Sequence, residues 1–253
     1  TRKPNFSTIF DVSHMGIFES KDLNSELKYS LGKVLNVDLT KLKNNKAKLC
    51  VILDKYGNVF DDLLISNINN KKFRLVVNAA EKSDLYFKKL DPSNILKKNK
   101  KIIAIQGNGS QKVIEKMLNI NLSNLYFMEN KTIEDDKFEI CRCGYTGEDG
   151  FELYLNDYYG KEIYKYLVNL AEMTEETNVQ FGGLIERDIL RTEAGFNLSG
   201  AEFGENMNIK FNALNMPFLI DKKYRGDKKL ESSQFQTLLS SNKPFFNHPA
   251  NKA

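Results

Sequence analysis

The chain contains 253 residues, of which 41% are hydrophobic and 28% charged, so it can bury a substantial core. Its net charge of +4 is too mild for the basic surface of a nucleic-acid-binding protein. No apolar run approaches the ~20 residues needed to cross a bilayer, and we therefore expect a soluble protein with neither nucleic acid nor membrane as a partner.

Apolar residues spaced three and four positions apart predict five helices. The first, over 22–36, has leucine at every fourth position and Asp22 as its expected N-cap. The last, over 184–194, is expected to end at Gly195, a residue that readily adopts the left-handed conformation. The other three are expected over 81–90, 110–118 and around 163–171.

Short apolar runs bounded by turn residues predict strands. One hairpin is expected from 48–53 and 59–65, joined by a turn at 56–58. A second hairpin pairs 138–143 with 151–155, and single strands are expected over 73–77 and 101–105. Because strands and helices do not alternate regularly, the predicted fold class is α+β.

Neither metal nor disulfide chemistry is predicted. The three cysteines, Cys50, Cys141 and Cys143, are odd in number and lack the spacing of a zinc site. Two histidines are too few for a histidine-based metal site. We therefore expect reduced thiols and no bound metal.

Two adjacent acids interrupt the apolar strand over 59–65. Side-chain alternation puts Asp61 and Asp62 on opposite faces, so one of them is expected to point inward. A carboxylate that points inward needs a donor or a ligand, because burying it alone is costly. The alternative is a salt-bridged or edge-strand aspartate.

A glycine-rich turn over 143–150 presents Tyr145, and Glu152 follows in an apolar strand. A carboxylate in such a place can accept two parallel N–H bonds from a guanidine-like edge. An ordinary hairpin with solvated acids is the alternative. On the helix over 184–194, Arg187 and Arg191 share a face, and surface ion pairs such as Asp188 with Arg191 are the alternative to a binding role.

Six segments, in order along the chain, resemble the signature of the glycine cleavage system T-protein, the aminomethyltransferase family. They are FDVSHMG (10–16), GNVFDDLLI (57–65), LVVNAAEKSD (75–84), IQG (105–107), RCGYTGEDGFE (142–152) and RDILRTEAG (187–195). One short motif would be weak evidence, whereas six in order are highly specific.

The resemblance implies a folate-binding fold of two interleaved mixed α/β domains. The first domain is expected from 1–46 with 135–220, and the second, inserted domain from 47–134. Residues 221–253 are expected to be the remnant of a C-terminal β-barrel domain that is otherwise missing, and the family's N-terminal segment is also expected to be missing. Ser199 stands where the family often has tyrosine, and the chain contains no tryptophan.

The resemblance also implies an activity. The family transfers a methylene unit from the S-aminomethyl-dihydrolipoyl arm of H-protein to tetrahydrofolate, its co-substrate, with release of ammonia and without a metal. Asp62 corresponds to the acid near the reacting folate nitrogens, Glu152 to the carboxylate that binds the pterin edge, and Arg187 to a folate-site arginine. Asn78 and Tyr145 fall in blocks near the folate cavity.

The expected location is the mitochondrial matrix, for a eukaryotic protein; for a bacterial protein it is the cytoplasm, the less favoured of the two. Two alternatives stay open. One is a non-catalytic folate-binding relative of the iron–sulfur assembly type, although its K-G-C-Y-x-G-Q-E-type motif is not found here. The other is an inactive truncated form that still binds H-protein.

Overall fold

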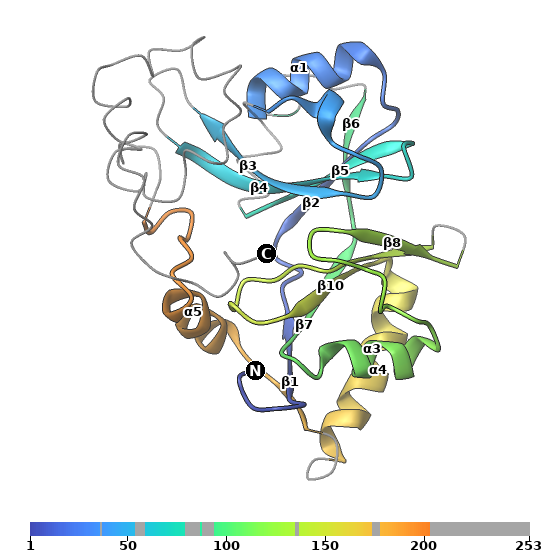
Figure 1. Cartoon of the computed structure of the whole chain (residues 1–253), viewed down its shortest axis with the longest axis vertical. Coiled ribbons are helices and arrows are strands. Elements are labelled where there is room, and N and C mark those ends of the chain that lie inside the picture. Colours follow the sequence, from blue (N-terminus) through green and yellow to red (C-terminus); the bar gives the residue numbers. More distant parts are fainter. Residues whose placement is uncertain are drawn as a thin grey trace. The chain divides into compact units, whose positions relative to one another are not determined.

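A computed structural model of the chain describes residues 1–35, 37–53, 59–78, 87, 94–134, 137–173 and 178–202 (Figure 1). The chain divides into two compact units. Unit 1 comprises Thr1–Met15 and Asn99–Phe196, and unit 2 comprises Gly16–Lys98 and Asn197–Ala253. Each unit has its own sheet and its own core.

Unit 1 is built on a six-stranded sheet that is antiparallel except for one edge pair. The parallel pair is β1 with β11, which joins an early and a late segment of the chain. In spatial order the strands are β11 (Val179–Phe181), β1 (Ser7–Asp11), β7 (Lys101–Gln106), β10 (Gly150–Leu155), β9 (Phe138–Cys141) and β8 (Asn130–Ile133).

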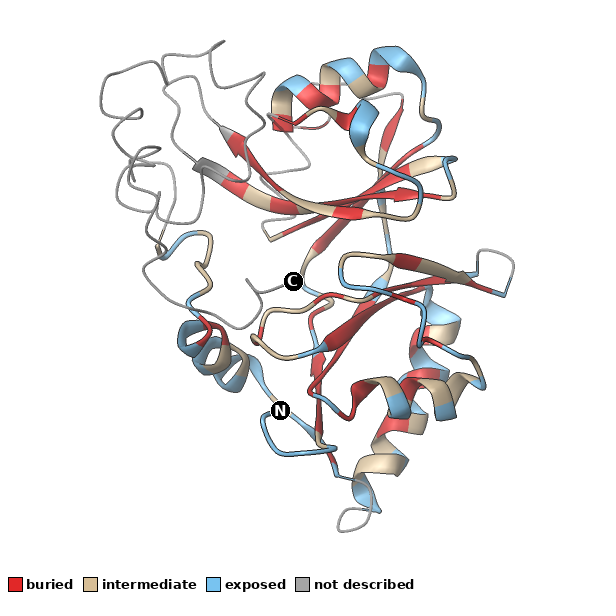
Figure 2. Ribbon diagram, in the orientation of Figure 1, coloured by how far each residue is buried: buried red, intermediate tan, exposed pale blue. Residues whose placement is uncertain are grey.

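Helices α3 (Ser110–Leu118) and α4 (Asp157–Glu172) cover one face of this sheet (Figure 1). Their Ile114 and Leu167 pack against strand residues such as Phe151 and Leu153, all almost fully buried. Because strand side chains alternate, Glu152 and Tyr154 point to the opposite face. The remaining helix, α5 (Leu184–Glu193), is mostly exposed (Figure 2).

Unit 2 contains a five-stranded antiparallel sheet covered on one face by α1 (Ser25–Leu35). Leucines of α1 pack on alternate residues of the central strands, including Leu63 and Leu75. A short 3-10 helix, η1 (Leu39–Lys41), follows α1. In spatial order the strands are β3 (Ala47–Leu53), β4 (Val59–Ile68), β5 (Lys72–Val77), β2 (Gly16–Ser20) and β6 (Ile95–Lys98).

The α+β fold class predicted from the sequence is confirmed, as are both hairpins and the helix over 110–118. Helix α5 ends where expected, with Gly195 at a φ of +76°. Strands β1, β2, β6, β8 and β11 were not predicted, because three to five residues are too few to reveal a period. The expected turn at 56–58, all but Phe87 of the expected helix over 81–90, and the expected remnant over 221–253 lie outside the described residues.

The compact units change at 15/16 and 98/99, whereas the domains expected from the resemblance change at 46/47 and 134/135 and stay a prediction. Residues 16–46 belong with unit 2, because β2 pairs with both β5 and β6. Residues 99–134 belong with unit 1, because β7 pairs with β1 and β10. The interleaving itself is present, since each unit is assembled from segments distant in sequence.

The N-cap expected for the first helix was placed two residues too early. Asn24 Oδ1 accepts a hydrogen bond from the Leu27 N–H at 2.8 Å, which satisfies a free donor of the first turn. Asp22 instead accepts from the Asn24 N–H at 3.3 Å and from Asn94 Nδ2 at 3.2 Å. Asp22 therefore fixes the chain that enters the helix, and Asn24 caps it.

Replacing Asn24 with alanine should lower the free energy of unfolding by about 1 kcal/mol, because the capping acceptor is lost. Asn24→Ser retains an acceptor at the same position and should lose only a few tenths of a kcal/mol. Urea denaturation measures both. Equal losses in the two variants would show that the cap contributes nothing.

Candidate functional site

Asp62 and Asn78, two of the residues predicted for the site, meet in unit 2. Leu63 pairs with Val77, so Asn78, which follows β5 directly, lies beside Asp62 on β4. Asn78 Nδ2 donates to Asp62 Oδ1 at 2.5 Å and to the Asp62 carbonyl at 3.2 Å. The pair lies on the sheet face opposite α1, because Leu63 points toward α1.

The Asp62 carboxyl has an unusual protonation equilibrium. Burial raises its pKa from the ordinary value of 3.8 to about 7, the charge of Asp61 raises it further, and hydrogen bonds from Asn78 and the backbone oppose the shift. Asp61 is only 1% exposed and its Oδ1 accepts from the Asp62 N–H at 3.0 Å. Asp61 is thus the inward aspartate, and Asp62 is a group that can exchange a proton near neutral pH.

Glu152, predicted to bind the pterin edge, is a buried carboxylate on β10 of unit 1. The Tyr154 hydroxyl donates to its Oε2 at 2.6 Å. Tyr154, itself fully buried, was not predicted as a site residue. Its position two residues after Glu152, and therefore on the same face of the strand, was the available signal.

Arg187 and Tyr145, also predicted, meet elsewhere in unit 1. The Arg187 guanidinium carbon lies 4.7 Å from the centroid of the Tyr145 ring, a cation–π contact. Phe196 stacks on Tyr145 with the centroids 5.6 Å apart and the rings 13° from parallel. Burial and the positive charge of Arg187 together lower the pKa of His14, against the opposing charge of Asp11. Phe196 and His14 were missed as members of this group.

Arg191 has a structural role that the sequence left open. Its Nε donates to Asp188 at 2.7 Å and its Nη1 to the Phe196 carbonyl at 3.1 Å. The predicted pairing with Asp188 therefore exists, between an Arg191 side chain that is only 7% exposed and an Asp188 side chain that is 55% exposed. Arg191 holds the chain after α5 in place and so positions Phe196 against Tyr145.

The glycine-rich turn over 143–150 is fixed by Gln106 at the end of β7. Gln106 Nε2 donates to the Cys143 carbonyl at 3.1 Å and the Phe151 carbonyl at 3.4 Å, and its Oε1 accepts from Thr146 at 3.2 Å. The amide thus bonds both ends and the middle of the turn that carries Tyr145 and leads to Glu152.

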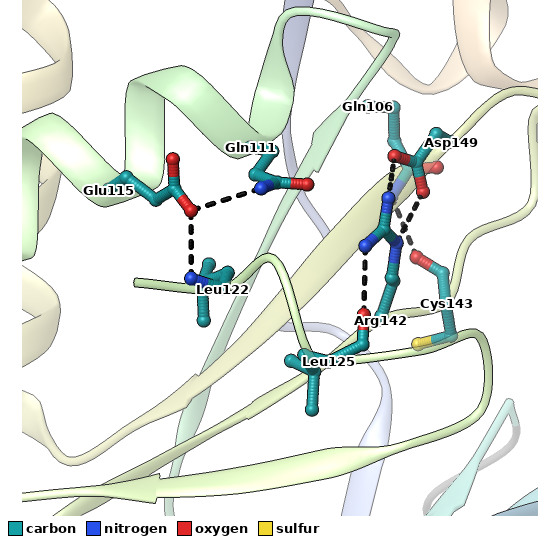
Figure 3. A network of polar contacts seen from close by, with 8 residues as sticks. All are labelled: Gln106, Gln111, Glu115, Leu122, Leu125, Arg142, Cys143 and Asp149. Atoms are coloured by element: carbon teal, nitrogen blue, oxygen red, sulfur yellow. Dashed lines mark hydrogen bonds and ion pairs between the residues drawn. The ribbon is translucent and has the colours of Figure 1, made fainter. Parts of the chain in front are cut away.

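Arg142 also stabilises this turn through hydrogen bonds (Figure 3). Its guanidinium donates to both carboxylate oxygens of Asp149, at 2.9 and 2.6 Å, and to the Leu125 carbonyl at 2.8 Å. Paired bonds of this kind fix orientation as well as distance. Arg142 and Asp149, although they belong to the motif that carries the resemblance, shape the turn.

Two glycines of the motif are required by this close packing. A Cβ added to Gly144 would lie 1.9 Å from Gln106 Oε1, and one added to Gly150 would lie 2.4 Å from Gln106 Nε2. Neither leaves room for a side chain unless the buried Gln106 amide moves. The position of the Gln106 amide therefore requires glycine at 144 and 150.

Among the described residues, no cluster of three or more histidine, cysteine, aspartate or glutamate side chains is placed to hold a metal ion. The described cysteines Cys50, Cys141 and Cys143 are all free thiols. In the same part of the chain, no helix combines the length and apolar character needed to span a membrane.

Comparison with known proteins agrees with these features. Residues 5–223 match the family model described as the GCVT N-terminal domain. The chain belongs to this family. The family assignment confirms the resemblance found in the six sequence motifs.

Two of the curated relatives of this chain, both named aminomethyltransferase, show how much of the sequence is shared. That of Thermoanaerobacter pseudethanolicus is 34% identical over 214 residues, which cover 80% of this chain and 56% of the relative. That of Thermosipho melanesiensis is 34% identical over 235 residues, covering 88% and 62%. The chain thus spans about three-fifths of the length of these relatives.

A solved structure supports the fold. The glycine cleavage system aminomethyltransferase T from Bartonella henselae superimposes with a TM-score of 0.77 at 23% identity, covering 95% of this chain and 64% of that one. The T-protein-like fold predicted from the sequence is therefore confirmed. The roles of Asp62, Asn78, Glu152, Arg187 and Tyr145 stay predictions, and the first two belong to unit 2 while the other three belong to unit 1.

Replacing Asp62 with asparagine should stabilise the fold in a pH-dependent way. Because the folded pKa of about 7 lies above the ordinary 3.8, the folded protein holds a proton that the unfolded chain releases, so wild-type stability falls as pH rises from about 4 to about 7. Asp62→Asn removes this slope, at about 1.4 kcal/mol per pKa unit. Its stability relative to wild type should increase up to about pH 7 and then level off, as measured by denaturation from pH 4 to 8. A pH-independent difference would contradict the raised pKa.

Gly150→Ala should lower the free energy of unfolding by about 1–3 kcal/mol, because the new methyl group overlaps the buried Gln106 amide. Gly160→Ala in α4 is the matched control. There the added Cβ meets the Lys101 side chain at 3.1 Å, which can move, and the change should stay under about 1 kcal/mol. Adding Gln106→Ala to Gly150→Ala should relieve the overlap, and a fully additive loss in denaturation experiments would argue against it.

Proposed function

We propose that this chain is an aminomethyltransferase of the glycine cleavage system. It transfers the methylene carbon of the S-aminomethyl-dihydrolipoyl arm of H-protein to tetrahydrofolate, releases ammonia and yields 5,10-methylenetetrahydrofolate. The observation that carries the proposal is the Asp62–Asn78 pair, a proton-exchanging carboxyl at the position of the family's reactive acid. Membership in the family and the names of the relatives support it.

The reaction requires little covalent chemistry from the protein. Two folate nitrogens bond to the methylene carbon while its bonds to sulfur and to the amino nitrogen break. The two protons released by the folate nitrogens end on the dihydrolipoyl thiol and on ammonia. The carbon passes through cationic character between these events, so a nearby anion and a proton acceptor both lower the barrier.

In this proposal Asp62 supplies both. The ionised carboxylate stabilises the developing cation, and a pKa of about 7 lets the same group accept a folate proton and return it to the leaving amine at neutral pH. Asn78 keeps one carboxylate oxygen oriented by its hydrogen bond. Holding the folate and the lipoyl arm together supplies much of the remaining rate.

The residues of unit 1 bind the folate in this proposal. The pterin presents a ring N–H and an amino group side by side, and the Glu152 carboxylate can accept both. Arg187 lies over the Tyr145 ring, a contact through the ring face that does not use its N–H donors. No metal takes part. The relatives named above are bacterial, which favours the cytoplasmic of the two expected locations, and the mitochondrial one stays a prediction.

The test measures tetrahydrofolate-dependent ammonia release from aminomethyl-loaded H-protein. Asp62→Asn should lower kcat about 100- to 1000-fold, because an anion aimed at the developing charge is lost. The wild-type rate should rise with pH through about 7, as Asp62 ionises, and this rise should be absent from the variant. Asp38→Asn, which removes a carboxylate bonded to Thr40 in the same unit, should match wild type.

If the Asp62→Asn variant were as active as wild type, the proposed role of Asp62 would be rejected. Absence of release by the wild-type chain would reject the activity itself. Folate binding without release would then favour a non-catalytic folate-binding relative. H-protein binding without folate binding would favour an inactive form that only docks H-protein.

A further inference from the structure

Polar side chains line the face of the unit 1 sheet that points away from α3 and α4. Glu152 and Tyr154 follow each other on this face of β10, at 7% and 0% exposure. Tyr154 lies opposite Glu139 of β9, which is also fully buried and which pairs with Lys100 Nζ at 3.5 Å. Four polar side chains therefore lie together in a largely buried environment. They are Glu152, Tyr154, Glu139 and Lys100.

The contact between Tyr154 and Glu152 fixes the direction of the carboxylate. A phenol carries a single O–H proton, and here it donates to Glu152 Oε2 at 2.6 Å. The Tyr154 ring is fully buried in the sheet, so its hydroxyl has a fixed position. Within the described part of the chain, the other oxygen, Oε1, accepts no hydrogen bond.

Glu139 is a second carboxylate close to Tyr154. Residues directly opposite on paired antiparallel strands have Cβ atoms about 5 Å apart, so Tyr154 lies between two carboxylates. Lys100 balances the charge of Glu139. Glu152 is the carboxylate that accepts the hydrogen bond from the tyrosine hydroxyl. Hydrogen bonds to carboxylates are among the stronger ones.

We propose that Tyr154 is a positioning residue that orients Glu152 for recognition of an amino-pterin edge. The inference rests on the proposed function, because it takes Glu152 as the folate-binding carboxylate. With Oε2 held by the tyrosine, Oε1 is presented to one donor of the ligand, and the remaining lone pair of Oε2 serves the adjacent donor. Tyr154 therefore determines preference for ligands that offer two parallel donors over those that offer one.

The test compares two ligands: tetrahydrofolate and an analogue in which a methyl group replaces the pterin amino group. Tyr154→Phe removes only the hydroxyl. It should weaken tetrahydrofolate binding about tenfold, the effect of losing one hydrogen bond to a charged group. Binding of the analogue should weaken much less, so the preference for tetrahydrofolate should fall by about the same factor. In turnover assays, KM for tetrahydrofolate should rise while kcat at saturation stays within about twofold.

The matched control is Tyr159→Phe. It also removes a tyrosine hydroxyl that bonds a carboxylate, Glu134, at 2.9 Å, but at an exposed site. It should change neither affinity nor preference. Tyr154→Met, which removes the same hydroxyl with a flexible apolar side chain, is measured beside Tyr154→Phe in case either variant is poorly folded.

A double-mutant cycle isolates the action through Glu152. In a Glu152→Ala background, which removes the acceptor of the tyrosine hydroxyl, Tyr154→Phe should have little further effect on affinity, whereas additive losses would overturn the inference. Equal losses for both ligands would overturn it as well, because they would indicate a general structural defect. Failure of wild type to bind tetrahydrofolate would instead reject the proposed function. Wild-type binding together with unchanged preference in Tyr154→Phe would reject this inference alone.

Discussion

The buried amide of Gln106 is the contact on which unit 1 most depends. It ends β7 and bonds the chain at Cys143, Thr146 and Phe151, so one side chain sets the path of the turn between β9 and β10. Tyr145 lies within that turn and Glu152 follows it directly. A buried amide that lost these partners would be costly, so the turn and the end of β7 stabilise each other.

The two sheets place their ionisable groups by the same rule. Each sheet packs one face against helices with apolar side chains, and strand alternation then sends every second residue to the other face. Asp62 and Glu152 both lie on the face away from the helices. Neither interrupts an apolar core, and each finds a hydrogen-bond donor, Asn78 or Tyr154, from its own unit. These carboxyl groups are therefore accommodated without weakening the apolar packing inside each unit.

The sequence pattern marked Asp61, Asp62 and Glu152 as candidates, because an acid within a short apolar strand conflicts with its surroundings and so stands out. Only the family resemblance selected Asp62 over Asp61. The sequence could not locate Phe196 or the role of Gln106, because their contacts join residues tens of positions apart and depend on register. The N-cap of the first helix was wrong because the sequence is ambiguous there. Asp22 and Asn24 are both good capping residues, and only the hydrogen bond from the Leu27 N–H decides between them. The compact units could not be derived from the sequence either, because the pairing of β2 with β5 leaves no local signal.

If Asp62 acts as proposed, the adjacent acids of β4 bring function and stability into opposition. Without Asp61, one of the two causes that raise the pKa of Asp62 would be lost, and Asp62 would stay ionised to lower pH. A permanently ionised carboxylate could stabilise a cation but would be a poor proton acceptor at pH 7. With Asp61 present, Asp62 exchanges protons near neutrality, although its ionised form then destabilises the fold. In the proposed reaction, Asp61 therefore contributes through its charge, which raises the pKa of Asp62, even though its own side chain points toward the core.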